Sequence, residues 1–188
     1  MVQAGRVTEW ADRVTALARV SNGVSGIRII GIDGPSGSGK STLARAVAAQ
    51  LDCPIVEIDD FVSWNDLAGW WPRFDAQVLS PLLDGRDARY QRRDWTGDEF
   101  GDALGEWRAV PWHPFVVIEG VTATRREAAG RLSLAVWVEA PRELRLARGI
   151  ARDGEDHRAL WEDWMWREDE FFAADRTRAR ADLVVPGV

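Results

Sequence analysis

A glycine-rich segment, GPSGSGKS at residues 34–41, ends in a lysine and a serine. It satisfies the pattern G-x-x-x-x-G-K-[ST], in which glycines let the backbone curl until successive amide groups point at phosphate oxygens. It follows an apolar run and precedes a helical pattern, the context that the motif requires. The segment therefore predicts a site for a nucleoside triphosphate. ATP is the expected nucleotide, because the guanine-reading sequence Asn-Lys-x-Asp does not occur.

In such a loop the lysine reaches the β and γ phosphates, the serine hydroxyl binds Mg²⁺, and the helix N-terminus adds a partial positive charge. These roles fall to Lys40 and Ser41, and Thr42 is expected to cap the helix or contact the α phosphate. We predict that nine consecutive residues hold the nucleotide: Gly34, Pro35, Ser36, Gly37, Ser38, Gly39, Lys40, Ser41 and Thr42.

Carboxylates follow two other predicted strands. Asp59 and Asp60 end the segment CPIVEIDD, and Glu119 ends PFVVIE. In an open α/β sheet, ligands bind outside the carboxyl ends of the strands. A carboxylate there can orient an acceptor hydroxyl and take its proton, or hold Mg²⁺ directly or through water. The alternative is that these acids merely cap turns in contact with solvent.

Three arginines, Arg145, Arg148 and Arg152, stand at i, i+3 and i+7 of a predicted helix and share one face. A stripe of this kind can clamp a transferring phosphoryl group, whose transition state spreads negative charge over its oxygens. The alternative is a solvated face paired with Glu143 and Asp153.

Strands are expected over residues 27–32, 53–58, 115–119, 132–140 and 181–187, and helices over residues 7–20, 40–51, 74–85, 141–153 and 157–180. This alternation predicts an α/β fold with a mainly parallel five-stranded sheet, helices on both faces and a helical lid. We expect a single domain over residues 1–188. It would comprise an N-terminal helix at residues 1–22, an acceptor-binding insertion at residues 61–112, and a lid with its following helix at residues 145–175.

Composition limits the function classes. The chain has 188 residues and a net charge of −6, which argues against nonspecific binding to nucleic acid. Its single cysteine excludes an internal disulfide and fits a reducing cytoplasm. No apolar run approaches the roughly 20 residues of a membrane span. We expect a cytoplasmic protein without a membrane or nucleic-acid partner; a homodimer is left open.

Tryptophan is unusually frequent, with 11 residues. Within the insertion, Trp70 and Trp71 could stack on a flat ligand, and Arg93 and Asp94 could bind hydroxyls or the edge of a base. We predict these four residues, together with Asp60, as contacts of the acceptor. The competing interpretation is an apolar subdomain core with a charged rim.

Several motifs together resemble the uridine kinase family, with its relatives pantothenate kinase, phosphoribulokinase and nicotinamide riboside kinase. GIDGPSGSGKST is similar to the phosphate loop of that family, and IDDF to its acidic-aromatic motif. FDAQVLSPLLDG, ARYQRRDW, VVIEGV, RLARGIARD and ADLVVPG follow in the family's order. The resemblance implies a P-loop NTPase fold, a three-layer sandwich, with Asp59 as general base and a nucleoside as acceptor.

The chain departs from the motifs of the uridine kinase family in three places, and these bear on the identity of the acceptor more than on the phosphoryl transfer. Arg93 stands where a tyrosine often precedes the hairpin aspartate, Gly149 replaces a lid arginine, and GEDHRALWEDW replaces an Arg-Gly-Arg lid turn. The loop GPSGSGKS also resembles that of cytidylate kinase, but DDFVSW replaces the sequence that follows strand two there. A hydroxyl acceptor is therefore favoured over a monophosphate.

The prediction is an ATP- and Mg²⁺-dependent kinase of a small hydroxyl compound, by resemblance a nucleoside such as uridine or cytidine. Asp59, Lys40, Arg148 and Arg152 would be catalytic. Arg145 would contact the nucleotide, and Ser41, Glu119 and Asp59 would hold the metal. The alternatives are a kinase for a vitamin precursor, a sugar or a nucleoside monophosphate, or an ATP-binding regulatory protein that turns over no acceptor.

Overall fold

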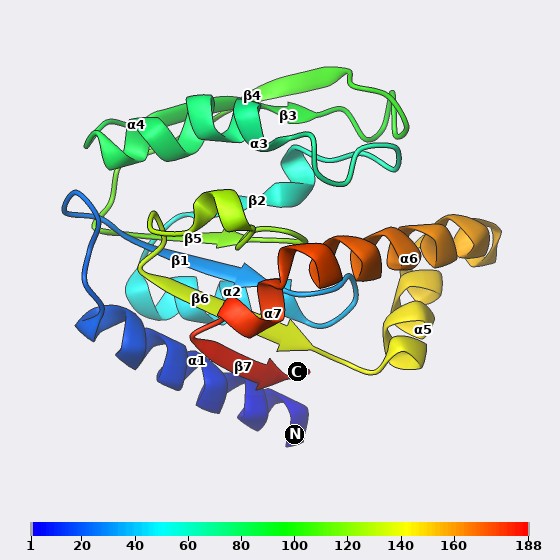
Figure 1. Ribbon diagram of the computed structural model, residues 1–188, viewed down its shortest axis with the longest axis horizontal. Coiled ribbons are helices and arrows are strands. Elements are labelled where there is room, and N and C mark those ends of the chain that lie inside the picture. Colours follow the sequence, from blue (N-terminus) through cyan, green and yellow to red (C-terminus); the bar gives the residue numbers. More distant parts are fainter. Residues whose placement is uncertain (1, 188) are drawn as a thin grey trace.

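The computed structural model describes residues 2–187, and its centre is a parallel sheet in the order β2-β5-β1-β6-β7 (Figure 1). The strands are β1 (Arg28–Asp33), β2 (Ile55–Glu57), β5 (Phe115–Glu119), β6 (Leu134–Glu139) and β7 (Leu183–Pro186). Each neighbouring pair runs parallel. The predicted five-stranded α/β fold is confirmed. The second strand is shorter than expected, because the chain enters a 3-10 turn, η1, at Ile58–Asp60.

Helices α1 (Val2–Val20) and α2 (Lys40–Leu51) cover one face of the sheet. The side chains of successive residues of β1 point to opposite faces of the sheet, as the two-residue period of a strand requires. Ile30 and Ile32 pack with α1 and α2, whereas Ile29 belongs to the core on the other side. Because both faces are covered, the central strands are apolar almost without interruption.

The insertion and the C-terminal helices cover the opposite face (Figure 1). The predicted helix at residues 74–85 is part of a continuous helical segment with a wide π turn: α3 (Trp71–Phe74), η2 (Asp75–Leu79) and α4 (Ser80–Leu83). An antiparallel hairpin follows, formed by β3 (Ala88–Arg93) and β4 (Leu104–Val110). Its strands were not predicted from periodicity; only the resemblance indicated a hairpin.

The lid comprises α5 (Arg142–Asp153), the 3-10 turn η4 (Glu155–His157) and α6 (Arg158–Asp175). The single predicted helix at residues 157–180 is wrong at its end. Arg176 adopts the left-handed conformation, φ 56°, and a short helix α7 (Thr177–Arg180) begins after it. Within the described residues 2–187, no helix has both the length and the apolar character needed to cross a membrane.

Candidate active site

The glycine-rich loop connects β1 to α2, as predicted. Gly34 and Gly37 have positive φ angles of 139° and 76°, which L side chains rarely adopt. A Cβ atom on Gly34 would lie 2.0 Å from the Val138 carbonyl oxygen, and one on Gly37 would lie 2.8 Å from that of Arg145. The loop is therefore closely packed against β6 and α5, and only glycine fits at these two positions.

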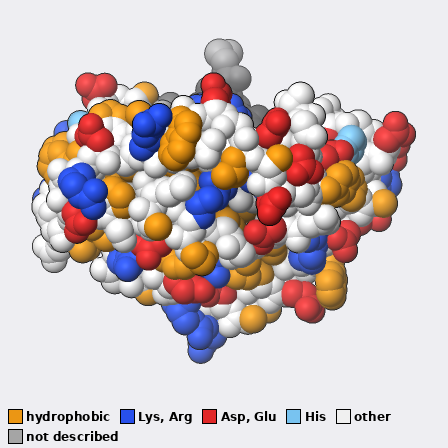
Figure 2. Space-filling model, turned by 90° about the horizontal axis from the view of Figure 1, so that it is seen from above, with side chains coloured by type: hydrophobic (Ala, Val, Ile, Leu, Met, Phe, Trp, Pro, Cys, Tyr) orange, Lys and Arg blue, Asp and Glu red, His pale blue; other side chains and the backbone are white. Residues whose placement is uncertain are grey.

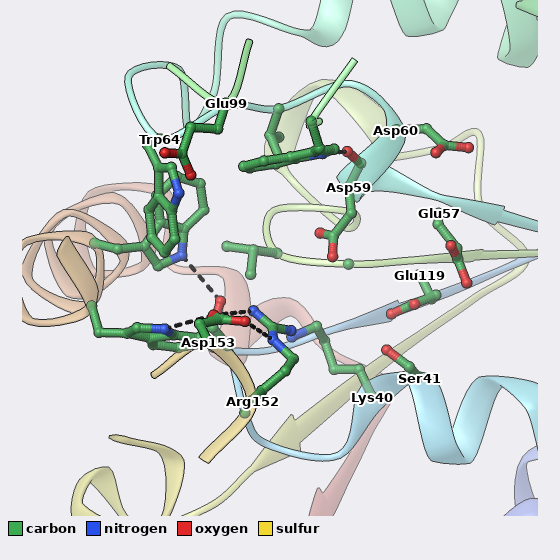
Figure 3. Close-up of a pocket in the computed structure, with 18 of the residues that line it drawn as sticks. Lys40, Ser41, Glu57, Asp59, Asp60, Trp64, Glu99, Glu119, Arg152 and Asp153 are labelled. Atoms are coloured by element: carbon green, nitrogen blue, oxygen red, sulfur yellow. Dashed lines mark hydrogen bonds and ion pairs between the residues drawn. The ribbon is translucent and has the colours of Figure 1, made fainter. Parts of the chain in front are cut away.

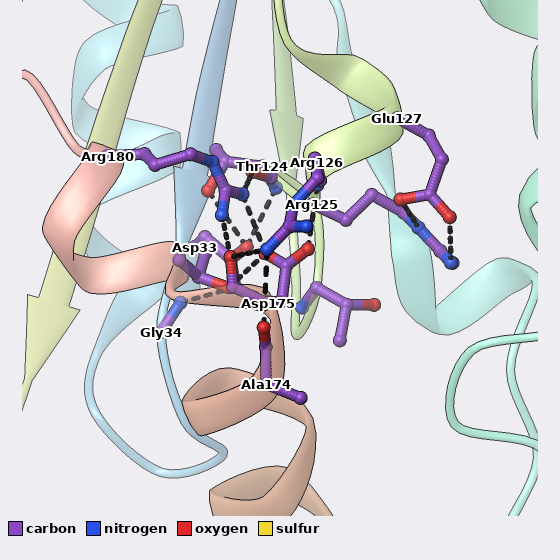
Figure 4. Close-up of polar contacts among 11 residues, drawn as sticks. Asp33, Gly34, Thr124, Arg125, Arg126, Glu127, Ala174, Asp175 and Arg180 are labelled. Atoms are coloured by element: carbon purple, nitrogen blue, oxygen red, sulfur yellow. Dashed lines mark hydrogen bonds and ion pairs between the residues drawn. The ribbon is translucent and has the colours of Figure 1, made fainter.

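Asp33, the last residue of β1, fixes the start of the loop through its side chain (Figure 4). Its buried carboxylate accepts hydrogen bonds from the Gly34 amide at 2.6 Å, the Thr122 amide at 2.9 Å and the Thr124 amide at 2.7 Å. Burial raises the pKa of Asp33 to about 6, and the bonds from Thr124 and Gly34 oppose that rise. Asp33 thus joins the loop to the segment after β5. Its position at the end of an apolar strand was the only sequence signal for this role.

A cavity of about 530 Å³ opens beside the loop, at the carboxyl ends of β2 and β5 (Figure 3). Loop residues Ser36, Gly37, Lys40 and Ser41 form one wall. The remaining lining includes acidic, basic and aromatic side chains: Glu57, Asp59, Asp60, Trp64, Arg92, Trp95, Glu99, Glu119, Arg152, Asp153, His157, Trp161 and Trp164. The cavity therefore brings the phosphate loop, the strand-end carboxylates and the lid into one site.

The neighbouring residues Asp59 and Asp60 have different surroundings. Asp59 is exposed and its side chain points toward Glu119 and the loop (Figure 3). Asp60 is only 4% exposed and accepts a hydrogen bond from the Tyr90 hydroxyl at 2.7 Å. Burial, and then this bond, raise the pKa of Tyr90. Asp59 is thus available to a ligand, whereas the hairpin holds Asp60.

The three predicted metal ligands, Ser41, Asp59 and Glu119, line the same cavity. Burial raises the pKa of Glu119 to about 7; the charge of Lys40 and a hydrogen bond with Ser41 lower it, and the charge of Asp59 raises it. Crowded carboxylate and hydroxyl oxygens suit Mg²⁺, which usually adds substrate phosphates to one or two carboxylates. In residues 2–187 no group of three or more acidic, histidine or cysteine side chains forms a complete metal site. A magnesium ion here would need phosphate ligands as well.

The three lid arginines lie at different depths. Arg145 is 5% exposed and forms an ion pair with Glu168 at 3.3 Å. The Arg148 Nη1 atom donates to the Gly37 carbonyl at 2.9 Å. Of the three, only Arg152 lines the cavity, where it forms hydrogen bonds with Asp153 at 2.7 and 2.9 Å. Arg145 and Arg148 therefore contact the loop itself, and Arg152 faces the ligand space.

The structure places four predicted acceptor contacts, Trp70, Trp71, Arg93 and Asp94, outside the lining of this cavity. Trp70 is 2% exposed and donates to the Leu67 carbonyl and the Thr122 hydroxyl, both at 3.2 Å. Asp94 accepts from the Gly97 amide at 2.9 Å. Trp70 and Trp71 pack edge to face with each other, and Arg93 is buried.

Other aromatic residues line the cavity instead. Trp64 and Trp95 lie with ring centroids 6.3 Å apart and planes at 89°, and Trp161 and Trp164 contact Trp64 from α6. Trp64 and Trp95 lie in the predicted acceptor-binding insertion at residues 61–112, but they were not among the five residues predicted to contact the acceptor. Both residues lie near the Asp59–Asp60 pair and the hairpin in the sequence. Trp70 and Trp71 share that proximity, so it could not show which tryptophans line the cavity.

The parallel sheet and the loop between β1 and α2 define the P-loop kinase fold. The chain belongs to the AAA domain family AAA_18, whose model matches residues 30–176. A solved structure described as a possible uridine kinase from Bacillus stearothermophilus superimposes with a TM-score of 0.69. It is 20% identical, and the comparison covers 98% of this chain and 100% of that one. At this identity the likeness establishes the fold alone.

Two curated relatives are bifunctional pantoate ligase/cytidylate kinases of Synechococcus. The protein of strain JA-2-3B'a(2-13) is 32% identical over an alignment of 115 residues, and the match covers 55% of this chain and 21% of that protein. The protein of strain JA-3-3Ab is 32% identical over an alignment of 118 residues, and the match covers 56% of this chain and 22% of that protein. The chain thus spans about a fifth of the length of these relatives. Family and fold together place the chain among AAA-domain proteins with a P-loop kinase fold, and they do not identify its reaction or substrate.

Proposed function

We propose that the protein transfers the γ-phosphoryl group of ATP to a hydroxyl group of a small molecule. The observation that carries this proposal is the position of Asp59. Its exposed carboxylate lines the same cavity as Lys40 and Ser41 of the phosphate loop. A protein that only binds ATP needs the loop, but it does not need a carboxylate base facing it.

Each of these residues has a separate role in the proposed reaction. Lys40 and the loop amides bind the phosphates, and Ser41 with Glu119 or Asp59 would hold Mg²⁺, which would neutralise phosphate charge. Asp59 orients the acceptor hydroxyl and takes its proton. Arg152 neutralises charge on the transferring group, while Arg145 and Arg148 keep the lid against the loop. A closed lid also excludes water that would otherwise hydrolyse ATP.

We propose a nucleoside, of the uridine or cytidine kind, as the acceptor. The rings of Trp64 and Trp95 meet at nearly a right angle at the cavity wall, so a flat base could stack on one face and contact the edge of the other. Glu99 and Arg92 lie in the same lining and offer an acceptor and a donor for hydroxyls or a base edge.

A nucleoside monophosphate is less well supported, despite the similarity to proteins that include a cytidylate kinase. Acidic side chains gather toward the end of the molecule that carries the lid (Figure 2). In the cavity lining, Glu57, Asp59, Asp60, Glu99, Glu119 and Asp153 outnumber Lys40, Arg92 and Arg152. Arg92 already contacts Asp60 and Glu106, both at 3.4 Å. An acceptor with its own phosphate would meet a surplus of negative charge.

The test is ADP release from Mg·ATP against a panel of nucleosides, deoxynucleosides, nucleoside monophosphates, vitamin precursors and sugars, with Asp59→Asn as the control. Stimulation by one nucleoside that is lost in Asp59→Asn, while ATP binding remains, would support the proposal. Stimulation by a sugar or vitamin precursor would support the proposed kinase reaction but show that the acceptor is not a nucleoside. Tight ATP binding with no acceptor-dependent turnover would favour the regulatory ATP-binding protein.

A further inference from the structure

Helix α6 carries a buried carboxylate that the proposed reaction does not use. Glu168 is 0% exposed, on a helix that combines charged residues with tryptophans and phenylalanines. Burying a carboxylate costs free energy unless hydrogen-bond donors surround it. Three donors do so: the Ser36 amide at 2.9 Å, the Trp164 indole at 2.7 Å and the Arg145 guanidinium at 3.3 Å. The carboxylate is therefore satisfied, and one of its partners belongs to the phosphate loop.

The amide, hydroxyl and carbonyl groups of Ser36 each form a hydrogen bond with a side chain of α5 or α6. Its amide donates to Glu168 at 2.9 Å, its hydroxyl accepts from the Trp164 indole at 3.0 Å, and its carbonyl accepts from Arg145 at 3.5 Å. Glu168 contacts both of the other side chains. The loop conformation at Ser36, immediately before Gly37, is thus fixed by a cluster with Glu168 at its centre.

The same cluster reaches the acceptor side of the cavity. The rings of Trp164 and Trp64 pack edge to face, with centroids 5.6 Å apart and planes at 88°. Both rings line the cavity. One face of α6 therefore supports the phosphate loop through Glu168 and the proposed acceptor wall through Trp164.

We infer that Glu168 is a positioning residue, which holds the phosphate loop in its nucleotide-binding conformation through Ser36 and anchors the lid through Arg145. It acts through these partners and does not itself contact the nucleotide. The inference goes beyond the proposed transfer reaction, but it rests on that proposal's assumption that the loop binds Mg·ATP. It also gives the tryptophan-rich helix a role that the sequence left unassigned.

The decisive variant is Glu168→Gln, which keeps the shape of the side chain. The glutamine loses the charge pairing with Arg145, and its NH₂ group must face one of the three donors. We expect the Kd of Mg·ATP and the KM for ATP to rise about tenfold, the effect of losing one hydrogen bond to a charged group, with a smaller change in kcat. Glu162→Gln is the matched control, because Glu162 is a solvent-exposed residue of the same helix.

Equilibrium titration with Mg·ATP separates the outcomes. If the wild type binds and Glu168→Gln binds equally well, the inference is wrong, even if the variant unfolds at lower temperature, since Glu168 would then be only structural. Should Glu168→Gln not fold, Trp164→Phe decides: it removes the indole N–H but keeps a ring, and unchanged ATP affinity would overturn the inference. A wild type that does not bind Mg·ATP would refute the proposed function and this inference together.

Discussion

The indole of Trp161 occupies the space that a side chain at Gly149 would need. An ideal Cβ on Gly149 would lie 2.4 Å from Cε2 of Trp161, and two further ring atoms lie within 2.7 Å. Trp161 is 2% exposed and donates to Asp153 at 2.9 Å, so its ring has little freedom to move. This contact gives a physical reason why Gly149 stands where the uridine kinase motif has a lid arginine. Helix α6 packs against α5 at that position and leaves no room for a long side chain.

Gly149→Ala tests that packing. Helix propensity alone predicts a stabilisation of about 1 kcal/mol, because glycine is unfavourable inside a helix. The contact predicts the opposite sign, a loss of about 1–3 kcal/mol, since a rigid ring must shift. Urea unfolding measures the sign directly, and tryptophan fluorescence reports whether the indole environment changes. A more stable variant with unchanged fluorescence would show that the lid helices do not pack as described.

Asp60→Asn should mainly lower stability, whereas Asp59→Asn should mainly lower turnover. Asp60 is held by the Tyr90 hydroxyl at 2.7 Å and lies 3.4 Å from Arg92. Its replacement should lower the free energy of unfolding by about 1–3 kcal/mol and leave most turnover intact. Asp59→Asn should leave stability nearly unchanged and lower turnover by about 10²–10⁴. Urea unfolding and ADP release, measured on both variants, check this. A stable Asp60→Asn with a raised acceptor KM would instead support the predicted substrate contact.

Glu119 predicts a specific pH dependence of stability. Its pKa rises from 4.5 to about 7 in the folded protein, chiefly through burial. The folded state thus holds the proton more tightly than the unfolded state, so the free energy of unfolding falls as the pH rises through this window. At about 1.4 kcal/mol per pKa unit, the penalty above pH 7 amounts to about 3 kcal/mol.

Glu119→Gln should remove this penalty. Relative to the wild type, the variant should therefore gain stability between pH 5 and pH 8, as measured by urea unfolding at both values. Asp33, whose pKa is also raised, remains in both proteins and cancels in the comparison. Added Mg·ATP should reduce the pH dependence of the wild type, because a bound cation favours the ionised carboxylate. Parallel stability curves for the two proteins would contradict the role of Glu119.

The sequence predicted the features that depend on local patterns. The loop at residues 34–41 lies between a strand and a helix because its spacing encodes that geometry. The positions of Asp59 and Glu119 followed from a general rule, since carboxyl ends of parallel strands share one edge of the sheet.

Contacts between distant segments were not predictable in this way. Trp64 and Trp70 both follow strand two, but only tertiary packing places Trp64 on the cavity and Trp70 in the core. The bond between Glu168 and Ser36 joins residues 132 positions apart. No periodicity in either segment indicates that α6 returns to the loop.

Arg152→Ala tests the charge at the transferring group. Arg152 lines the cavity, lies close enough to Asp59 to interact with its charge, and has a side chain that is 66% exposed. A group that acts mainly on transition-state charge should affect kcat far more than ATP binding. We expect kcat to fall by about 10²–10³ with a nearly unchanged Kd for Mg·ATP. Arg158→Ala is the control, because Arg158 pairs with Glu155 on the exposed side of the lid. Equal kcat values for the two variants would exclude Arg152 from the reaction and leave the clamp to Arg148 or Arg145.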